Sequence, residues 1–368
     1  MTYDYLIVGA GLFGSAFAYE AGKKGHRCLV LEKRNHIGGN LYTENKCGIN
    51  VHMYGPHIFH TSDKEIWDYI NAFADFYPFV NQPLANYKGK LYHLPFNMNT
   101  FYELWGTTTP QEAKRVINVQ TRPYQKENPE NLEDYVLSTI GNDLYQKLVK
   151  GYTEKQWGRK ASELPAFLIK RLPLRWTYDN NYFNDRYQGI PIGGYTAIIE
   201  KMLNQADVQT SVDFFDDQRG FRKYAHKLVY TGMIDRYYDY RYGKLDYRSL
   251  RFQHEILECD NFQGNAVINY TDAQTPYTRI IEHKHFEGTI SDKTVITKEY
   301  PQSFSDLEEP YYPINNFSNN ERYNRYKSLT EQDPDVLFRG RLGQYRYYNM
   351  DEILSSVLTT AQKEFNGR

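Results

Sequence analysis

The sequence predicts an α/β protein with a Rossmann-like nucleotide-binding domain, a helical insert and an antiparallel β-sheet domain. Three observations lead to this prediction. Residues 3–40 follow the order strand, glycine-rich turn, helix, strand and acid that is typical of a dinucleotide-binding unit. Residues 99–171 carry apolar side chains at helical spacing. Short runs of alternating apolar and polar residues follow one another over residues 245–300, as in an antiparallel sheet.

Three glycines form the clearest motif of the chain. Gly9, Gly11 and Gly14 follow an apolar run over residues 5–8 and fit the spacing G-x-G-x-x-G. In this motif the first glycine makes a tight turn, the second lets the backbone approach a pyrophosphate, and the third lets the helix pack closely on the strand. The N–H groups at the start of the following helix would bind the phosphates of a dinucleotide.

A second apolar run, residues 28–31, leads to Glu32, whose carboxylate can accept both hydroxyl groups of an adenosine ribose. A carboxylate at this place argues against a 2′-phosphate, and therefore against NADP. The glycine motif and Glu32 do not distinguish NAD from FAD. Gly38 and Gly39 follow soon after and resemble the extended fingerprint of FAD-binding flavoproteins, so we expect FAD.

The composition limits the classes of function. The 368 residues suffice for two or three domains, and the net charge of −1 gives no general affinity for nucleic acid or an acidic membrane. No apolar run approaches the about 20 residues of a membrane span, and the chain starts without a basic leader, so we expect a cytoplasmic protein. The 35 tyrosines suit a polar ligand with a ring, such as a nucleotide sugar, although an aromatic-rich core would give the same composition.

The sequence predicts no metal site. Cys28, Cys47 and Cys259 are scattered and lack the spacing of metal ligands or of a disulfide framework. His57 and His60 lie close together, but we expect no third ligand to join them in a metal site.

Separate segments of the chain are expected to come together in the nucleotide-binding domain. Residues 227–230 form an apolar run that ends at a glycine, as a strand returning to the nucleotide-binding sheet would. Residues 336–338 are expected to form a strand near the end of the chain. Residues 351–363 are expected to form a terminal helix, which Asn349 would cap and for which Glu352 would complete a capping box. The expected domains are 1–78, 186–235 and 315–368 for nucleotide binding, 99–171 for the helical insert, and 79–98, 172–185 and 236–314 for the antiparallel sheet.

Further motifs span nearly the whole chain. Besides the N-terminal fingerprint they are residues 55–60, 151–157, 170–173, 276–283, 310–315 and 340–343. Together, and in this order, they resemble the motifs of bacterial UDP-galactopyranose mutases. The resemblance implies an isomerase that interconverts UDP-galactopyranose and UDP-galactofuranose without net redox change. It also implies FAD that is active when reduced by an external reductant, a homodimer, and a product used in cell-surface polysaccharide.

The resemblance further implies that the cofactor performs covalent catalysis, with N5 of reduced flavin attacking the anomeric carbon as UDP leaves. The protein would then bind UDP and neutralise the leaving diphosphate. Arg171 and Arg279 match the family's pair of diphosphate arginines, whose planar, permanently charged guanidinium groups suit this task. His57 resembles the histidine beside the flavin ring. We expect these three residues to be catalytic.

The same likeness gives the expected ligand contacts. Tyr152 resembles the residue that stacks on uracil, and Trp157 the residue beside the sugar. The other expected substrate contacts are Asn81, Thr153, Tyr182, Asn269, Tyr312 and Tyr347. Asparagine and threonine are also common at polar positions that bind no ligand, and this alternative stays open for Asn81, Thr153 and Asn269. The expected cofactor contacts are Gly9, Gly11, Phe13, Gly14, Glu32, Lys33, Gly39, Asn40, His57, Ile58, Arg341, Asn349 and Met350.

One position departs from the family pattern. The family commonly has aspartate two residues after the tyrosine that matches Tyr347, and this chain has Asn349. Asparagine caps a helix as well as aspartate does but lacks its charge. Two other functions stay open: an FAD oxidoreductase of the amine-oxidase type, which shares the fingerprint, and a UDP-sugar-binding flavoprotein without catalysis, which only Asn349 suggests. The sequence also leaves open whether the sugar is galactose or a modified relative.

Overall fold

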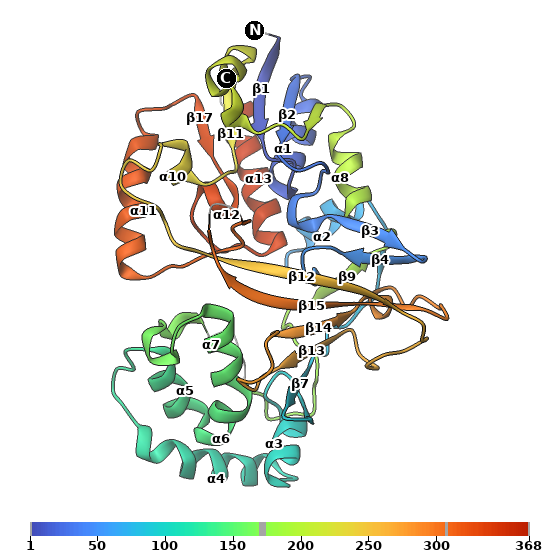
Figure 1. The fold of residues 1–368 in the computed structure, drawn as a ribbon, viewed down its shortest axis with the longest axis vertical. Coiled ribbons are helices and arrows are strands. Elements are labelled where there is room, and N and C mark those ends of the chain that lie inside the picture. Colours follow the sequence, from blue (N-terminus) through green and yellow to red (C-terminus); the bar gives the residue numbers. More distant parts are fainter. Residues whose placement is uncertain (1, 169–173, 306–307, 367–368) are drawn as a thin grey trace.

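The computed structural model describes residues 2–168, 174–305 and 308–366, which form a parallel sheet, a larger mixed sheet and a helical region (Figure 1). The parallel sheet has five strands in the order β10, β2, β1, β11, β17. The strands are β1 (Tyr3–Val8), β2 (Cys28–Glu32), β10 (Asp207–Thr210), β11 (Ala225–Tyr230) and β17 (Val336–Phe338). The expected return of the chain to this sheet is confirmed, since β11 lies beside β1.

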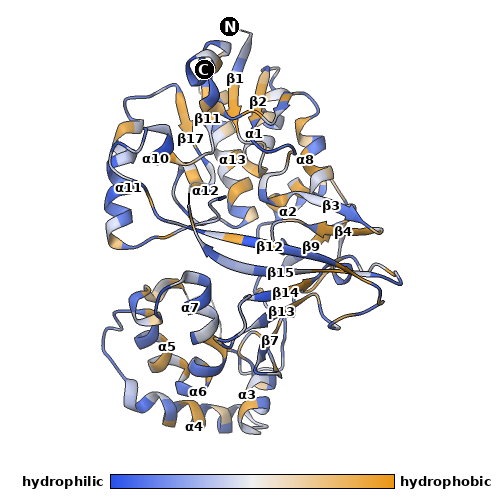
Figure 2. Ribbon diagram, in the orientation of Figure 1, coloured by the Kyte–Doolittle hydropathy of each residue, from blue (hydrophilic) through white to orange (hydrophobic). Residues whose placement is uncertain are grey.

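Helices cover both faces of the parallel sheet, because successive side chains of a strand point to opposite sides. Ile7 packs among the helices of one face, and its neighbour Leu6 among those of the other. The first face carries α1 (Leu12–Lys23), α8 (Tyr195–Leu203) and α13 (Met350–Asn366), and the second carries α10 (Ile234–Tyr237) and α11 (Phe317–Thr330). Figure 2 shows the apolar colour of the enclosed strands. The predicted Rossmann-like α/β fold is confirmed.

The larger sheet crosses the middle of the molecule and has seven strands in the order β16, β12, β15, β14, β13, β7, β8 (Figure 1). They are β7 (Leu84–Tyr87), β8 (Lys90–His93), β12 (Tyr247–Leu257), β13 (Val267–Tyr270), β14 (Arg279–Glu282), β15 (Thr294–Ser303) and β16 (Tyr312–Pro313). Its pairs are antiparallel, as predicted, except that β13 runs parallel to β7. A long stretch of chain separates these two strands, so no hairpin turn fixes their relative direction.

Short strands connect the two sheets. β3 (Thr43–Lys46) and β4 (Ile49–His52) form a hairpin. β9 (Tyr187–Pro191) pairs with both β5 (Phe59–Thr61) and β6 (Phe76–Tyr77). The other short helices are α2 (Lys64–Asn71), α9 (Gln218–Phe221) and α12 (Gly340–Gly343).

The helical region lies at the far end of the larger sheet from the parallel sheet (Figure 1). Its helices are α3 (Met98–Trp105), α4 (Pro110–Thr121), α5 (Leu132–Ile140), α6 (Asn142–Leu144) and α7 (Gly151–Trp157). The helical pattern predicted here is confirmed up to residue 168, and residues 169–171 lie outside the described residues. Loops separate α3, α4 and α5, and the stretch from α5 to α7 is interrupted twice. Gly141, with φ +86°, separates α5 from α6, and a π-helical turn (Tyr145–Lys150) precedes α7.

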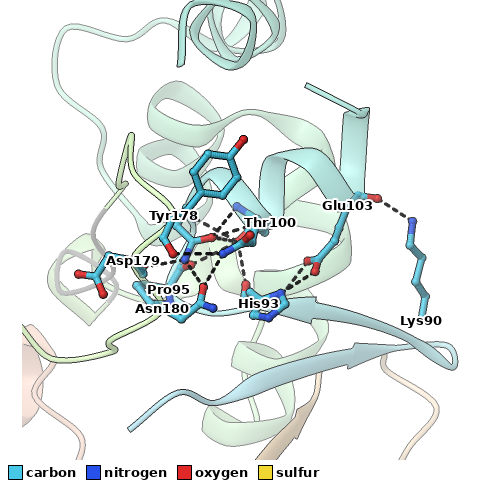
Figure 3. Close-up of polar contacts among 10 residues, drawn as sticks. Lys90, His93, Pro95, Thr100, Glu103, Tyr178, Asp179 and Asn180 are labelled. Carbon is cyan, nitrogen blue, oxygen red and sulfur yellow. Dashed lines mark hydrogen bonds and ion pairs between the residues drawn. The ribbon is translucent and has the colours of Figure 1, made fainter. Parts of the chain in front are cut away.

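Asn97 joins α3 to a distant segment of the chain. Its partners Thr100, Asp179 and Asn180 are labelled in Figure 3. Its side-chain oxygen accepts hydrogen bonds from the N–H groups of Asn99 and Thr100, which caps the helix. Its side-chain nitrogen donates to the carbonyl oxygen of Asp179 and to Oδ1 of Asn180. One buried amide thus fixes both the start of α3 and the segment that leads to Tyr182.

Replacing Asn97 with alanine is expected to lower the free energy of unfolding by about 2 kcal/mol or more. The change removes a helix cap, worth about 1 kcal/mol, and leaves further buried groups without partners. Chemical denaturation measures the loss. Thr109→Ala is the matched control, because Thr109 caps α4 at an exposed position and is expected to cost only about 1 kcal/mol. Equal losses of stability in both variants would contradict the role of Asn97 in joining α3 to Asp179 and Asn180.

Candidate functional site

The first cavity lies where β1, β2 and β11 end, at the edge where parallel sheets bind ligands. Gly9 has φ +102°, and a Cβ there would lie 2.2 Å from Oγ1 of Thr231. A Cβ on Gly14 would lie 2.0 Å from the carbonyl oxygen of Gly9, so α1 can pack on this turn only with glycine. A Cβ on Gly11 would meet nothing nearer than Cα of Gly39, at 4.0 Å. Space for a ligand therefore remains in front of Gly11.

Glu32 ends β2 at one side of this cavity and is buried. Its Oε2 accepts a hydrogen bond from the N–H of Ala10 at 2.9 Å, and its Oε1 accepts one from the N–H of Arg34 at 3.0 Å. These bonds fix the orientation of the carboxylate. Each carboxylate oxygen can accept a second bond, so both remain able to accept the hydroxyl groups of a ribose. The arrangement fits the adenosine half of a dinucleotide.

His57 and Arg341 line the other end of the first cavity. Nδ1–H of His57 donates to the carbonyl oxygen of Gly55 at 2.8 Å, which leaves Nε2 as an acceptor. Burial, together with the nearby charge of Arg341, lowers the pKa of His57 to about 4, so the ring is neutral at pH 7. Arg341 donates from Nε and Nη2 to the carbonyl oxygen of Tyr348, at 2.9 and 2.6 Å. These bonds hold the guanidinium of Arg341 at the wall of the first cavity.

The structure brings most of the expected cofactor residues to this cavity. Those that line it are Gly9, Gly11, Phe13, Gly14, Glu32, Lys33, Gly39, Asn40, His57, Arg341 and Met350. Ile58 is instead buried beside His57. Asn349 precedes Met350, and its N–H donates to Oε2 of Glu352 at 2.7 Å, which is one half of the expected capping box.

Sequence reasoning missed several residues of this cavity. Arg34 and Glu309 are two of them: Glu309 pairs with Arg34 at 3.1 Å and with the expected residue Lys33 at 2.8 Å, which ties the end of β2 to the segment before β16. Thr231 donates to the carbonyl oxygen of Val8 at 2.7 Å, directly beside the glycine turn. Its place at the end of a predicted strand of the nucleotide-binding sheet was the signal that could have indicated it.

A row of polar side chains crosses the larger sheet beside a second cavity. Asn269 of β13 is opposite Arg279 of β14, and Arg279 is opposite Glu299 of β15. Residues opposite one another on neighbouring strands point to the same face. The loop with Gly55 lies over this row, since a Cβ on Gly55 would be 3.4 Å from Oε2 of Glu299. The row therefore reaches the loop that carries His57.

Arg279 lines the second cavity, as do the charged residues Arg159 and Glu163. Nη2 of Arg279 donates to the hydroxyl oxygen of Tyr152 at 2.7 Å, and its Nε lies 3.2 Å from Oε1 of Glu299. Burial opposes the charge of Arg279, but ionised Glu299 more than offsets this and raises the pKa of the guanidinium. Burial also raises the pKa values of Tyr152 and Tyr312, which remain protonated hydroxyl donors. The cavity thus combines a fixed cation with hydroxyl groups, which suits a diphosphate.

The expected substrate residues are placed in two groups. Tyr152, Trp157, Arg279, Tyr312 and Tyr347 line the second cavity. The other described members are near it but are not among its lining residues: Thr153 is buried in α7, Asn269 is opposite Arg279, and Asn81 accepts from the N–H of Tyr182 through its carbonyl oxygen. Arg171 lies outside the described residues.

Several polar residues at the second cavity were missed from the sequence. Those that line it are Gln156, Arg159, Glu163, Asn315 and Asn316. The buried Oε1 of Gln156 has no hydrogen-bond partner in the described part of the chain. The position of Gln156 within the motif 151–157 could have indicated it. Glu299 is not among the lining residues but pairs with Arg279, and only the register of β14 and β15 indicates it.

The two cavities meet at an aromatic pair. The Arg341 guanidinium lies over the ring of Tyr347, 4.9 Å from its centre, and the rings of Tyr347 and Tyr312 are 5.9 Å apart. Arg341 lines the first cavity, and both tyrosines line the second. A ligand group in the second cavity would therefore lie next to the end of the first that holds His57 and Arg341.

His57 and the two buried histidines behind it, His52 and His283, predict a loss of stability in acid. Nδ1 of His52 accepts from the N–H of His57, and Nδ1 of His283 accepts from the N–H of His52, so protonation would break these bonds. Burial lowers the pKa of His52 to about 3 and that of His57 to about 4, and holds that of His283 well below its usual value. Below about pH 6.5 the unfolded chain binds protons that the folded chain does not, so stability falls as the pH falls.

Denaturation at pH 7.5 and at pH 5 tests this prediction. Each of these histidines is expected to lower the free energy of unfolding by about 1.4 kcal/mol for each pH unit below 6.5. His283→Gln removes one titrating group and should make the dependence less steep. His226→Gln is the control, because His226 is exposed on β11 and its replacement should leave the slope unchanged. A slope that His283→Gln does not alter would contradict the explanation.

The fold and the two cavities define the class: a Rossmann-fold dinucleotide-binding protein with a second cavity, lined by arginine and tyrosine, next to the first. Comparison with protein families agrees with this. Residues 7–73 match the NAD(P)-binding Rossmann-like domain, and residues 147–347 match the family model of UDP-galactopyranose mutase.

Relatives match over almost the whole chain. A Klebsiella pneumoniae protein described as a probable UDP-galactopyranose mutase is 39% identical over 98% of this chain and 94% of its own length. The dTDP-fucopyranose mutase of Escherichia coli is 36% identical over 97% of each chain. A crystal structure of reduced UDP-galactopyranose mutase superposes with a TM-score of 0.74 over 100% of this chain and 95% of its own, at 13% identity, and supports the fold.

The chain belongs to the UDP-galactopyranose mutase family. The expected family and the expected enzyme class, an isomerase, are thereby confirmed. The amine-oxidase alternative is not favoured, because the mutase match over residues 147–347 lies outside the fingerprint that both groups share. Within the described residues, no helix is long and apolar enough to cross a membrane, and no cluster of three or more His, Cys, Asp or Glu side chains could hold a metal.

Proposed function

We propose that this enzyme interconverts UDP-galactopyranose and UDP-galactofuranose with FAD in the first cavity and the nucleotide sugar in the second. The observation that carries the proposal is the meeting of the two cavities at Arg341 and Tyr347. His57 and Arg341 would hold the flavin end of FAD, next to the second cavity. When bound and reduced, FAD would supply the nucleophile, its N5 atom, that holds the anomeric carbon while UDP is away.

The residues of the second cavity support the departure of UDP. Breaking the bond to the anomeric carbon places negative charge on the diphosphate, and Arg279 offers a permanent positive charge beside it. The ion pair with Glu299 and the bond to Tyr152 hold the guanidinium in place before the reaction. Tyr312 and Tyr347 add hydroxyl donors. Because these groups are already oriented, little reorganisation accompanies the growth of charge.

Several parts of the proposal rest on the family likeness. Arg171 is proposed as the second diphosphate arginine. Tyr152 is proposed to stack on uracil and Trp157 to lie beside the sugar, while Asn81, Thr153, Tyr182 and Asn269 add polar contacts. An external reductant for the flavin, a homodimer and a role of the product in cell-surface polysaccharide complete the proposal.

The second candidate function is the same reaction on a different nucleotide sugar. It is favoured by the Escherichia coli relative, which is a dTDP-fucopyranose mutase of almost equal similarity to this chain. Comparing kcat/KM of the reduced enzyme for UDP-galactofuranose and for dTDP-fucofuranose distinguishes the two. The proposal predicts a higher value for the UDP sugar. A higher value for the dTDP sugar would transfer the assignment to the second candidate and leave the reaction type intact.

Replacing Asn349 with aspartate is expected to change kcat by less than about fivefold. The backbone of Asn349 is already fixed by Glu352, and a carboxylate at the start of α13 would add only about 0.3–1 kcal/mol of helix-dipole stabilisation. Steady-state kinetics and thermal unfolding measure the two effects. Asn349→Ser keeps a neutral cap and serves as the control. A large gain in rate for aspartate alone would show that the family's negative charge takes part in the reaction.

A further inference from the structure

Helix α7 presents two adjacent faces with different partners. Tyr152 and Gln156, four residues apart, line the second cavity. Gly151 and Lys155, also four apart, face the connection between β13 and β14, residues 271–278. The same connection leads directly into Arg279. The position of α7 on this connection therefore sets where the residues of the helix stand relative to Arg279.

Lys155 makes an unusual set of contacts with the end of β13 and this connection. Its Nζ donates to the carbonyl oxygens of Tyr270 at 2.8 Å, Thr275 at 2.9 Å and Tyr277 at 3.0 Å. A lysine ammonium has three N–H donors around one point, so three converging carbonyl groups match it. The planar fork of an arginine has no such geometry. Burial lowers the pKa of Lys155 to about 8, and the ammonium remains largely charged at pH 7.

The connection is shaped to present these carbonyl groups. Oδ1 of Asp272 accepts from the N–H groups of Gln274 and Thr275, at 2.9 and 2.8 Å, and Oδ2 accepts from the hydroxyl of Thr275 at 2.9 Å. These bonds turn the N–H groups toward Asp272 and leave carbonyl groups for Lys155. Asp272 also places a negative charge near the ammonium.

Gly151 brings the backbone of α7 against the same connection. A Cβ on this residue would lie 2.4 Å from the carbonyl oxygen of Thr271 and 3.0 Å from the backbone nitrogen of Ala273. Gly151 has ordinary helical dihedral angles, φ −64° and ψ −38°, so its backbone would accept another residue. Glycine is required at this position because α7 approaches the connection closely, and not because of the backbone dihedral angles of Gly151.

We propose that Lys155 is a positioning residue, which holds the nucleoside-binding face of α7 in register with Arg279 by binding one carbonyl group at the end of β13 and two of the β13–β14 connection. The inference rests on the proposed function, because it takes UDP as the ligand that contacts both α7 and Arg279. Tyr152 would contact the uridine half, and Arg279 the diphosphate half. Lys155 would contact neither half of UDP. It would act by fixing the distance between Tyr152 and Arg279.

Binding of UDP and of uridine to the FAD-loaded enzyme tests this role. A residue that only aligns two half-sites affects a ligand that spans them, and not a ligand that occupies one. Lys155→Met replaces the aliphatic part of the side chain up to Cε and removes the ammonium. We expect its Kd for UDP, measured by calorimetry, to rise at least about tenfold, while its Kd for uridine, measured by competition, changes less than about twofold. KM for the nucleotide sugar should rise with the Kd for UDP.

Control and companion variants make the result decisive. Lys150→Met is the matched control, because Lys150 lies one turn earlier with its ammonium near the ring of Tyr145, and it should leave both Kd values unchanged. Gly151→Ala pushes α7 away from the connection without removing a charge. It should reproduce the selective loss of UDP affinity, and it decides the matter if Lys155→Met does not fold.

The outcomes separate this inference from the proposed function. Unchanged UDP affinity in Lys155→Met and Gly151→Ala would overturn the positioning role. Equal losses for UDP and uridine would also overturn it, because they would show a general disturbance of α7. Failure of the unmodified enzyme to bind UDP would instead contradict the proposed function.

Discussion

Replacing Arg279 with alanine is expected to lower kcat/KM by about 10³-fold while the flavin remains bound. The variant loses the fixed charge beside the proposed diphosphate site, and preorganised donors of this kind typically contribute 10²- to 10³-fold. Glu299 would also lose its ion pair while it remains buried, which is expected to cost about 3 kcal/mol of stability. Steady-state kinetics, flavin absorbance and thermal unfolding measure these three effects separately.

Further variants distinguish the charge from its side effects. Arg279→Lys keeps the charge but loses the planar fork, and it should recover only part of the activity. Combining Arg279→Ala with Glu299→Gln should restore stability but not activity. Arg251→Ala is the control, since Arg251 is exposed on the same sheet with its guanidinium over the Tyr300 ring. Near-normal turnover in Arg279→Ala would refute its role in catalysis.

Replacing Gly14 with alanine is expected to lower the flavin content of the purified protein at least about tenfold. The new Cβ would lie 2.0 Å from the carbonyl oxygen of Gly9, which belongs to the backbone and cannot move aside. Helix α1 must then shift away from the turn, and its N–H groups leave the place where a pyrophosphate would bind. The ratio of flavin to protein measures the effect, and circular dichroism shows whether the fold persists.

Gly22→Ala provides the matched control in the same helix. A Cβ on Gly22 would lie 2.7 Å from Oε1 of Gln205, which is the end of a flexible side chain. Gln205 can move aside, and alanine favours the helix, so the flavin content should be unchanged. Full flavin occupancy in Gly14→Ala would contradict the account of the glycine turn.

Local patterns explain why much of the fold could be predicted. The turn at Gly9 and the acid at Glu32 belong to one continuous unit, so their spacing in the sequence equals their spacing in the structure. The same is true of Tyr152 and Trp157, which lie on one helix. Alternation of apolar and polar residues indicated the strands, because that alternation reflects burial on the faces of a sheet.

Long-range register explains what the sequence could not indicate. The pairing of Glu299 with Arg279 depends on how β14 aligns with β15, and no local pattern encodes that alignment. The parallel direction of β7 and β13 depends on the path of the long intervening chain. The cluster of carbonyl groups around Lys155 forms from a loop whose shape is set by Asp272, and a lysine in a helix gives no sign of it.

Turnover of UDP-galactofuranose by the purified protein, once oxidised and once reduced by dithionite, tests the central claim most directly. Chromatography of the nucleotide sugars follows the reaction. The account predicts conversion to UDP-galactopyranose only after reduction, because the reduced flavin would supply the nucleophile. Equal conversion in both states, or no conversion by a reduced, flavin-loaded enzyme that binds UDP, would contradict it.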